Sequence, residues 1–277
     1  MNQLFLDPSL ERQCLLLDNL KGQGLPVPEV FAFESDPGVL GAPFAVMECV
    51  AGYIPSPSYN TAGWLFDAPP EIRRELWLHG LAALVEIGNA AVDEMGFLAR
   101  PTYGGDPIDQ ELHYTLASLR WATSGTPAKG LEALWADLAA SRPDFQPRLS
   151  WGDARVGNVI FQDTSVAAVI DWEQASLSGS LVDLGWWLFF DVFHSTERGV
   201  ARLEGLPDRS ETLDRWVALG GVEPTDIDWY ERFAGLRLAT IFARVLQLAE
   251  ERGDNEFADS FRARNPAIRI LEAMNAI

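Results

Sequence analysis

An alternation of apolar and polar segments near the middle of the chain predicts a β-hairpin. Residues 159–161 form a short stretch of β-branched and aromatic side chains, residues 162–165 are mostly polar, and residues 166–170 form a second apolar stretch. Short runs of this composition on both sides of a turn are typical of paired antiparallel strands. The second run stops abruptly at Asp171.

Polar side chains stand at both outer ends of this predicted hairpin. Asp153 and Asn158 precede the first strand, and Asp171 follows the second. Because antiparallel strands lie side by side, we expect these outer ends to be neighbours in space. Asp and Asn are also common in turns and caps, so the set carries more weight than any one of its members.

Apolar residues recur at helical spacing over most of the remaining chain. The first helix is predicted over 8–22, with Asp7 as its cap and Pro8 in its first turn. A long pattern covers 69–95. Its inward positions are Leu76, Leu81, Leu84, Val85 and Ile87. The other helices are expected over 109–121, 127–141, 182–193, 208–220 and 224–251, followed by a short helical tail.

Two further strands and a loop complete the predicted elements. Residues 30–33 and 43–50 are predicted as strands joined by a turn that contains proline and glycine. Residues 55–68 contain proline, serine and tryptophan with little periodicity, so we expect a loop over a cleft. This mixture of helices with short strands indicates the α+β class.

Three polar residues within the apolar helices have competing interpretations. Asp191 and His194 lie at the end of the helix predicted over 182–193, where they either face a substrate cleft or cap the helix end. His79 is interpreted as a residue at the edge of the core, because no Cys or His lies at the spacing of a metal-ligand set.

Composition narrows the class of protein. The chain has 277 residues, of which 48% are hydrophobic, and ten tryptophans, enough for a large core. No apolar run is long enough to span a bilayer, and the first residues lack the pattern of a secretory signal. Two cysteines, Cys14 and Cys49, cannot form a disulfide framework and fit a cytoplasmic location.

The net charge of −19 also bears on partners. It disfavours nucleic acid and anionic membrane surfaces, because both repel an acidic protein. It weakly favours a cationic small molecule as the substrate. The oligomeric state cannot be deduced from the sequence.

The polar ends of the hairpin suit phosphoryl transfer. This reaction requires a protein mainly to position the reactants and to neutralise charge. A carboxylate must orient the attacking hydroxyl, and Asp153 is the candidate. Mg²⁺ prefers carboxylate and amide oxygens, which Asn158 and Asp171 would provide.

The segments Trp151-Gly-Asp-x-x-x-x-Asn158 and Val169-Ile-Asp-Trp-Glu173 resemble the aminoglycoside phosphotransferase family, whose members are related to protein kinases. The Asp-x-x-x-x-Asn spacing is that of the kinase catalytic loop. Most of the family has His in place of Trp151, and the Trp-Gly-Asp spelling resembles a branch linked to acyl-CoA dehydrogenases. The resemblance implies a protein-kinase-like, two-lobed fold and phosphorylation of a small-molecule hydroxyl by ATP and Mg²⁺.

The resemblance also implies roles for individual residues. Asp153 would be the catalytic aspartate, and Asn158 and Asp171 would bind the metal ion. Arg155 stands where protein kinases carry lysine, so it is either a contact for a phosphate oxygen or a surface arginine without a role. Asp183 would brace the catalytic loop from the helix that follows it, or would simply cap that helix.

The strand over 43–50 resembles the strand that leads into the hinge of this family. In the family, the adenine ring of ATP forms hydrogen bonds to the hinge backbone. The resemblance therefore implies that the nucleotide contacts Glu48, Cys49 and Val50. Read without the resemblance, the segment is an ordinary buried strand.

In this family a glycine-rich hairpin and a strand with a phosphate-binding lysine precede helix C, which the predicted helix over 8–22 resembles. The candidate glutamate partner of that lysine is Glu11 or, by closer register, Gln13. Two lysines, Lys21 and Lys129, are present, and neither lies on a predicted strand. We therefore expect a truncated amino lobe or a start codon assigned too late.

The resulting hypothesis has a partial amino lobe over 1–50 and a helical carboxyl lobe over 51–277. Its function is ATP- and Mg²⁺-dependent phosphorylation of an aminoglycoside-like or hydroxyacyl compound. One alternative is a catalytically silent module that binds a nucleotide or another ligand. Another is a metal-dependent hydrolase using Asp153 and Asp171, which is less favoured because all three histidines lie outside these motifs.

Overall fold

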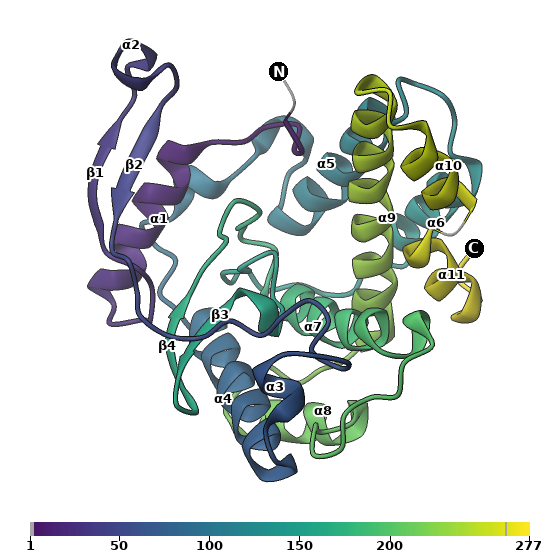
Figure 1. The fold of residues 1–277 in the computed structure, drawn as a ribbon. Helices are drawn as coiled ribbons and strands as arrows, with labels where there is room; N and C mark the ends of the chain where they lie inside the picture. Colours follow the sequence, from purple (N-terminus) through teal and green to yellow (C-terminus); the bar gives the residue numbers. More distant parts are fainter. Residues whose placement is uncertain (1–2, 264) are drawn as a thin grey trace.

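Two helices form the centre of the protein. The computed structural model describes residues 3–263 and 265–277. Helix α7 (Ser180–His194) packs directly against the long helix α9 (Ile227–Glu251), as Figure 1 shows. The run 184–190 is apolar on every face of α7, and a helix of this kind is stable only when other elements surround it. Accordingly, α7 is buried along almost its whole length.

The other helices pack around this pair. Helices α5, α6, α10 and α11 contact α9, whereas α4 contacts α7, α8 and strand β4. Their bounds are α4 (Pro70–Gly88), α5 (Pro107–Ala122), α6 (Lys129–Ala140), α8 (Arg209–Ala218), α10 (Asn255–Ala263) and α11 (Pro266–Ala273). Short 3-10 helices cover Gly96–Leu98, Pro101–Tyr103, Val156–Asn158 and Thr196–Arg198.

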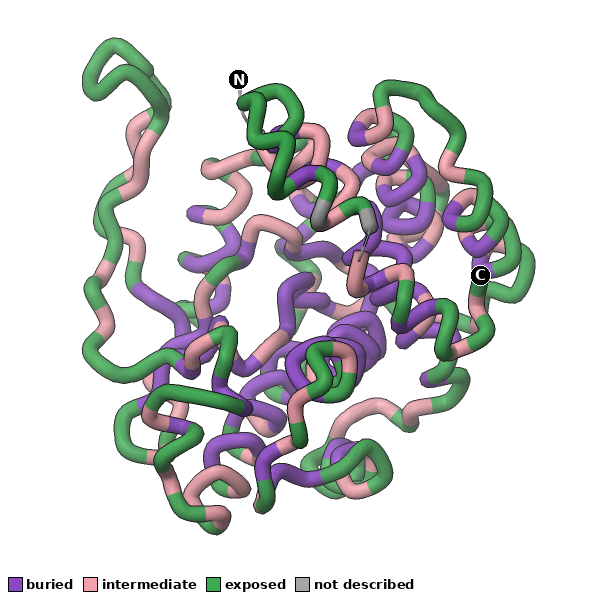
Figure 2. The backbone as a smooth tube through the Cα atoms, turned by 45° about the vertical axis from the view of Figure 1, so that its right-hand side comes forward, coloured by how far each residue is buried: buried purple, intermediate pink, exposed green. Residues whose placement is uncertain are grey.

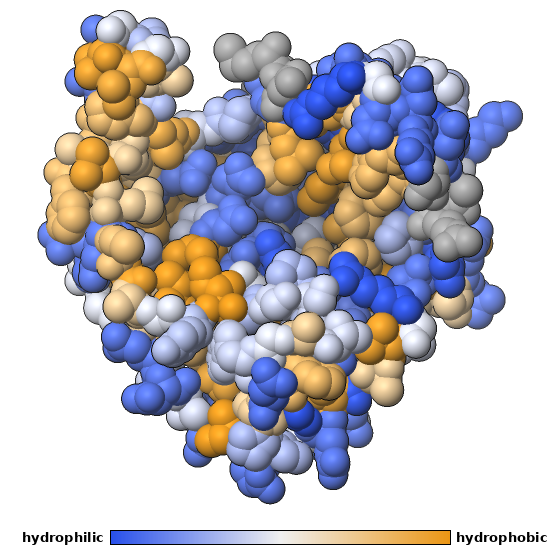
Figure 3. All heavy atoms as spheres, viewed as in Figure 1, coloured by the Kyte–Doolittle hydropathy of each residue, from blue (hydrophilic) through white to orange (hydrophobic). Residues whose placement is uncertain are grey.

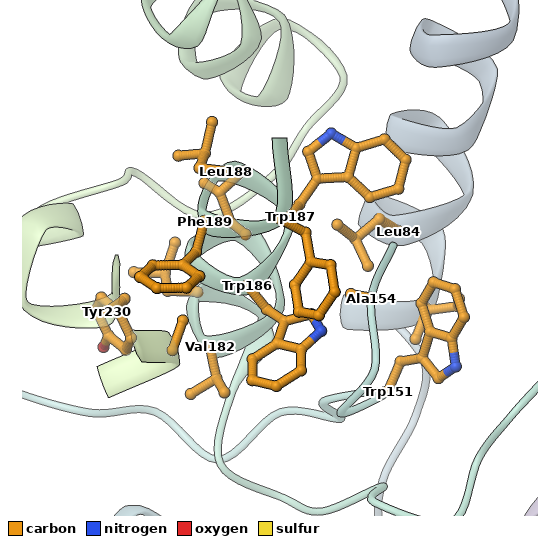
Figure 4. Close-up of a cluster of buried hydrophobic side chains, with 14 of the residues drawn as sticks. Leu84, Trp151, Ala154, Val182, Trp186, Trp187, Leu188, Phe189 and Tyr230 are labelled. Carbon is orange, nitrogen blue, oxygen red and sulfur yellow. The ribbon is translucent and has the colours of Figure 1, made fainter. Parts of the chain in front are cut away.

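The core contains large aromatic side chains. Trp186, Trp187 and Phe189 of α7 are each 2% exposed or less, and Figure 4 shows them beside Trp151 and Tyr230. Trp187 also packs edge to face on Trp77 of α4, with ring centroids 4.9 Å apart. Tryptophan-rich packing therefore joins the segment around Trp151 to α4, α7 and α9.

The predicted hairpin in the middle of the chain is confirmed. Strand β3 (Val159–Gln162) pairs with β4 (Ser165–Val169) in antiparallel register, with Val159 opposite Val169. The two residues between the strands form a tight turn in which Asp163 has a φ of 52°. Asp tolerates this left-handed conformation better than most residues because its short side chain can bond locally.

A second hairpin lies outside the main core. Strand β1 (Val30–Glu34) pairs with β2 (Phe44–Met47), the four-residue helix α2 (Pro37–Leu40) occupies the turn, and α1 (Leu10–Gly22) packs beside both strands. Figure 2 shows that much of this hairpin is exposed. Phe31 is 61% exposed, and Figure 3 shows apolar surface over the hairpin at upper left. The lobe boundary at residue 50 stays a prediction.

Three predicted boundaries are wrong in detail. Helix α1 begins after Ser9, whose side chain accepts a hydrogen bond from the Arg12 N–H, whereas Asp7 forms an ion pair with the Arg12 side chain. The predicted loop over 55–68 contains a one-turn helix, α3 (Trp64–Asp67). Strand β2 ends at Met47 rather than at Val50.

Helix α4 also ends earlier than predicted, at Gly88 instead of residue 95. A Cβ at Gly88 would overlap the side chain of Ser180, and Asn89 accepts a hydrogen bond from Arg148 Nη1 at 2.9 Å. These contacts with distant segments turn the chain. Met95 is an apolar residue that made the predicted helix too long. It is fully buried, but it lies at the end of a turn in which the Met95 N–H donates to the Val92 carbonyl. Apolar spacing alone does not distinguish the two arrangements.

None of the helices within the described residues has both the length and the apolar character needed to cross a membrane.

Gly185 permits the close contact between α7 and α9. A Cβ at this position would lie 2.6 Å from the backbone carbonyl carbon of Tyr230, too close for any side chain. We predict that Gly185→Ala lowers the free energy of unfolding by about 1–3 kcal/mol, because one helix must shift. Urea denaturation measures this change.

The control is Gly130→Ala at the start of α6, where a Cβ would meet no atom within 4 Å. We expect this variant to be as stable as the parent or slightly more stable. Equal stability of the parent and the Gly185 variant would contradict the close contact.

Candidate functional site

A buried carboxylate holds the loop that precedes β3. Asp183, on the first turn of α7, accepts hydrogen bonds from Ser150 Oγ at 2.9 Å, from the Trp151 N–H at 2.7 Å and from the Gly152 N–H at 2.8 Å. Its side chain is 0% exposed. Burial raises the pKa of Asp183 to about 6, and the hydrogen bonds and the charge of Arg237 oppose the rise.

Arg237 of α9 holds the same loop from the other side. Its Nη2 donates to the Gly152 carbonyl at 2.9 Å and to Gln174 Oε1 at 3.3 Å. Gly152 has a φ of 94°, and a Cβ there would overlap the backbone of Gln174. Gly152 is therefore held by hydrogen bonds on both sides: its N–H donates to Asp183, and its carbonyl oxygen accepts from Arg237.

The carboxylate of Asp153 is oriented by three side chains. Trp186 Nε1 donates to Oδ1 at 2.9 Å, Asn158 Nδ2 donates to Oδ2 at 2.6 Å, and Arg155 Nε lies 3.0 Å from Oδ2. Asp153 is only 8% exposed. Donors of this kind fix the orientation of a carboxylate.

Asn158 and Asp171 meet at the outer ends of the hairpin, next to Asp153. The Ile170 N–H donates to the Asn158 carbonyl at 3.0 Å, and Trp151 Nε1 donates to the Asp171 carbonyl at 3.1 Å. Asp171 has a φ of 66° and an exposed side chain. Because the Asn158 amide nitrogen is bonded to Asp153, its amide oxygen stays available to another ligand.

The electrostatics of these residues fit a divalent cation. The pKa of Asp171 is raised, first because neighbouring protein displaces part of its hydration and then because Asp153 carries like charge, with Arg155 opposing. The pKa of Glu173 is raised to about 7 by burial, Asp171 and Asp153. A bound cation would relieve this repulsion between carboxylates.

The small number of protein ligands suits Mg²⁺ better than a metal ion that is coordinated by protein side chains alone. No group of three or more His, Cys, Asp and Glu side chains in residues 3–263 and 265–277 is placed to hold a metal ion. Mg²⁺ usually keeps several waters and is bound by one or two carboxylates together with substrate phosphates. Asn158 and Asp171 could therefore hold it with a nucleotide.

Arg155 pairs with Asp153 in this structure. Besides the contact through Nε, its guanidinium lies 5.8 Å from the ring centroid of Phe190. Its side chain is 23% exposed, so part of it is open to solvent. Contact with a phosphate remains a prediction.

In the segment predicted as the hinge, Glu48 forms hydrogen bonds to neighbouring residues, whereas the next two residues leave their N–H groups without a backbone acceptor within the described residues. The Glu48 N–H donates to the Glu29 carbonyl, and the Glu48 carboxylate accepts from the Glu29 N–H and from Lys21 Nζ. These hydrogen bonds lower the pKa of Glu48, that from the Glu29 N–H most. Cys49 is exposed. Among the described residues, the N–H groups of Cys49 and Val50 have no backbone acceptor, so they are free to contact an adenine ring.

The candidates on the first helix do not form a pair with a lysine. Glu11 is exposed, and Gln13 lies on a small pocket that also includes Glu173. Lys21 instead donates to the Val27 carbonyl and pairs with Glu48.

Near the end of α7, His194 is buried and Asp191 is half-buried. Asp191 forms an ion pair with Arg202 at 2.7 Å, and His194 packs on the rings of Tyr59, Phe190 and Phe193. His79 is exposed, with Nδ1 2.6 Å from the Thr164 carbonyl oxygen. These contacts are structural in character.

Sequence reasoning missed three residues of this site. Trp186 and Arg237 contact the catalytic loop from helices far along the chain, and no local pattern marks them. Glu173 lies two residues after Asp171, and its place within the Ile-Asp-Trp-Glu segment was a signal that could have found it.

Comparison with known proteins agrees with this geometry. A model of the phosphotransferase enzyme family matches residues 6–219. Acyl-CoA dehydrogenase family member 10 of Mus musculus is 26% identical over 252 residues, which cover 86% of this chain and 22% of that protein. Member 11 of Rattus norvegicus is 24% identical over 282 residues, 95% of this chain and 34% of that protein. The matched region thus covers between about a fifth and about a third of the length of these relatives.

Solved structures confirm the fold. A putative aminoglycoside phosphotransferase from Ralstonia eutropha has a TM-score of 0.71 at 21% identity, covering 93% of this chain and 80% of that one. The GDP complex of aminoglycoside 2'-phosphotransferase-IIIa has a TM-score of 0.59 at 16% identity, covering 95% and 80%. A ternary complex of APH(4)-Ia with ADP and hygromycin B has a TM-score of 0.54 at 15% identity, covering 94% and 81%. The expected protein-kinase-like α+β fold is therefore correct.

His194 provides a test of the packing at the end of α7. Burial, followed by the charges of Arg198 and Arg155, lowers its pKa from 6.5 to about 3. The unfolded chain therefore takes up a proton below pH 6.5 that the folded chain refuses, so the stability from this group is complete above pH 6.5 and falls as the pH drops toward 3.

We predict that His194→Phe reduces the difference in unfolding free energy between pH 7.5 and pH 4.5 by about 2–3 kcal/mol. Urea denaturation of both proteins at the two pH values measures it. The exposed His113→Phe variant is the control and should keep the full difference. An unchanged difference in the His194 variant would contradict the buried, neutral imidazole.

Proposed function

The chain belongs to the phosphotransferase enzyme family, and from this premise we propose that it transfers the γ-phosphoryl group of ATP to a hydroxyl of a small molecule. The observation that carries the proposal is the fixed carboxylate of Asp153. Trp186, Asn158 and Arg155 orient it on a loop that Asp183 and Arg237 hold in place. Such preorganisation is the main contribution of a protein to phosphoryl transfer.

Asp153 is the proposed acceptor of the hydroxyl proton. As the hydroxyl oxygen forms its bond to the γ-phosphorus and the bond to the leaving ADP oxygen breaks, the proton passes to the Asp153 carboxylate. Both carboxylate oxygens are already aligned by N–H donors, so little reorganisation is required. The products are ADP and a phosphate ester.

Asn158 and Asp171 are the proposed ligands of Mg²⁺, through the amide oxygen and the carboxylate. When bound, the ion neutralises the phosphate charge. The raised pKa values of Asp171 and Glu173 support this role, because the carboxylates repel one another when no cation lies between them. Glu173, two residues after Asp171, would add negative charge near the ion.

The free N–H groups near Cys49 and Val50 are the proposed contacts for adenine. The similar structures with GDP and ADP support the use of a nucleotide. We further propose ATP as the donor, a small molecule as the acceptor and a cytoplasmic location, for which the free cysteines Cys14 and Cys49 are the support. Aminoglycoside-like and hydroxyacyl compounds are both candidate acceptors.

One observation favours a catalytically silent binding module as the second candidate. Lys21 is engaged with Val27 and Glu48, and Lys129 lies at the start of α6, so neither takes the place of a phosphate-binding lysine on a strand. In that case Asn158 and Asp171 would bind Mg²⁺ and a nucleotide, but no phosphoryl group would be transferred.

Replacement of the proposed base tests the catalytic function. We predict that Asp153→Asn lowers kcat for transfer from ATP to a small alcohol by about 10²–10⁴-fold, because the amide cannot take the proton. Transfer of radiolabelled phosphate to a panel of amino alcohols, aminoglycosides and hydroxyacyl compounds measures it.

Asp163→Asn is a matched control with the same chemical change. Asp163 is exposed at the hairpin turn, and Asn tolerates its positive φ, so transfer should proceed at the parent rate. Equal rates for the Asp153 variant and the parent would refute the assignment of the base.

A calorimetric titration separates nucleotide binding from catalysis. We predict that the full chain releases heat on binding ATP with Mg²⁺, and that Asp171→Ala weakens this binding at least about tenfold, because a metal ligand is lost. Binding without phosphate transfer would favour the silent module. No heat with the folded parent chain would reject both candidates.

A further inference from the structure

A pocket lined by arginines adjoins the catalytic loop. Helices α5 and α9 form its facing walls, Leu4 and Phe5 cover one side, and Glu173 and Gln174 connect it to the segment after β4. Its cavity volume is about 40 Å³, and about 520 Å³ of space free of protein atoms, open solvent included, lies in and before it. We call it the arginine pocket, after Arg100, Arg237 and Arg244 in its lining.

Arg237 is the arginine nearest to the catalytic loop. It is 5% exposed, and its Nη2 is occupied by the Gly152 carbonyl and Gln174. Its Nη1 is buried and has no hydrogen-bond partner among the described residues. The charges of Glu111, Asp183 and Asp153 act on Arg237, but none of these carboxylates accepts a hydrogen bond from Nη1, so a buried guanidinium is left with an unused donor. Such a group is costly unless something binds it.

The other two arginines are differently compensated. Arg100 is bonded to the buried carboxylate of Glu111, yet its Nε has no partner among the described residues. Arg244 stacks on Trp121 with its guanidinium 4.1 Å from a ring centroid, and it lies 3.5 Å from Glu251, whose side chain is 48% exposed. Its charge is therefore screened mainly by solvent-exposed groups.

The lining has an excess of positive charge and of unused donors. The lining holds three arginines and two glutamates, Glu111 and Glu173. Outside the lining, Asp183 and Asp153 act on Arg237, and Glu251 lies 3.5 Å from Arg244. Ser118, also in the lining, has a buried hydroxyl without a partner among the described residues. Buried guanidinium and hydroxyl donors without partners indicate a ligand that accepts hydrogen bonds, as a carboxylate does.

The pocket is close to the proposed chemistry. Arg237 is bonded to the carbonyl of Gly152, the residue before Asp153, and Glu173 is two residues from Asp171. An anionic end bound in the pocket would therefore lie one bonded contact away from the loop that carries Asp153. Leu4, Trp121 and Ile241 in the lining add apolar surface for a short carbon chain.

We infer that the arginine pocket binds the carboxylate of the phosphoryl acceptor, which is therefore a small alcohol that also carries a carboxylate. This inference rests on the proposed function and narrows its substrate class. A doubly charged phosphate fits less well, because Glu111 and Glu173 in the lining would repel its second charge. A cationic acceptor, which the net charge of −19 favours, would meet buried guanidinium groups instead.

The test compares an acid with its neutral amide. The full chain is titrated calorimetrically, without nucleotide or metal, with 3-hydroxypropanoate and 6-hydroxyhexanoate, with the two corresponding amides and with 6-aminohexan-1-ol. We expect at least one acid to bind tenfold or more tightly than its amide, and the amino alcohol to bind no better than the amides. Equal affinity of acids and amides, or no binding of either acid, would overturn the inference.

Arg244→Met locates the carboxylate. This variant removes the charge but keeps an apolar side chain against Trp121. It also removes the ion pair with the half-exposed Glu251 and the hydrogen bonds to the Gln3 carbonyl and to Gln247 Oε1. We expect acid binding to weaken tenfold or more. The control is Arg215→Met in α8, an exposed arginine outside the pocket, which should bind the acid as the parent does. Unchanged acid binding in the Arg244 variant would place the carboxylate elsewhere and overturn the inference.

Transfer assays with the same compounds distinguish the two failures. Phosphorylation of acid and amide at equal rates would preserve the phosphotransferase function and reject the carboxylate site. Selective acid binding without phosphorylation would preserve the site and reject the function.

Discussion

Asp183 lies inside the protein, where a carboxylate is costly, yet its two oxygens accept hydrogen bonds from a side chain and from two successive backbone N–H groups of one loop. Arg237 grips the same loop through the Gly152 carbonyl. Removing either partner would strand a buried charge and several loop groups. The position of Asp153 therefore depends on the packing of α7 against α9, because these helices supply the two charged residues.

The site on this loop combines one rigidly held carboxylate with two neighbouring carboxylates whose negative charges repel one another. Asp153 is held by Trp186, Asn158 and Arg155, whereas Asp171 and Glu173 repel it and each other. Neutral and cationic donors fix the first carboxylate, and a cation would satisfy the others. The hydrogen bonds to Asp153 restrict the motion of the carboxylate that is proposed to react. The proposed Mg²⁺ ion would relieve the repulsion between these carboxylates when it binds together with phosphate oxygens.

Global charge and local charge differ in this protein. The net charge is −19, but Arg100, Arg237 and Arg244 are each 8% exposed or less and face one pocket. Surface charge governs long-range attraction and solubility. Recognition depends on the few groups that a ligand touches after desolvation, and in this pocket those groups include three guanidinium side chains. The expectation of a cationic substrate from composition therefore carries little weight beside the pocket.

The sequence by itself determined the local elements and the order of the chemical groups. The hairpin over 159–169 and the inward face of α4 followed from apolar spacing, since each pattern reflects neighbours along the chain. The Asp153, Asn158 and Asp171 spacing pointed to the family that residues 6–219 match. Their individual roles remain predictions.

Only the tertiary structure decided what surrounds these groups. Trp186 and Arg237 lie 33 and 85 positions from the loop residues that they bond, and no periodicity links residues so far apart. The end of α4 at Gly88 likewise depends on Ser180 and Arg148. Local pattern specifies which side chains share a face, whereas burial, pKa and hydrogen-bond partners arise only when distant segments pack together.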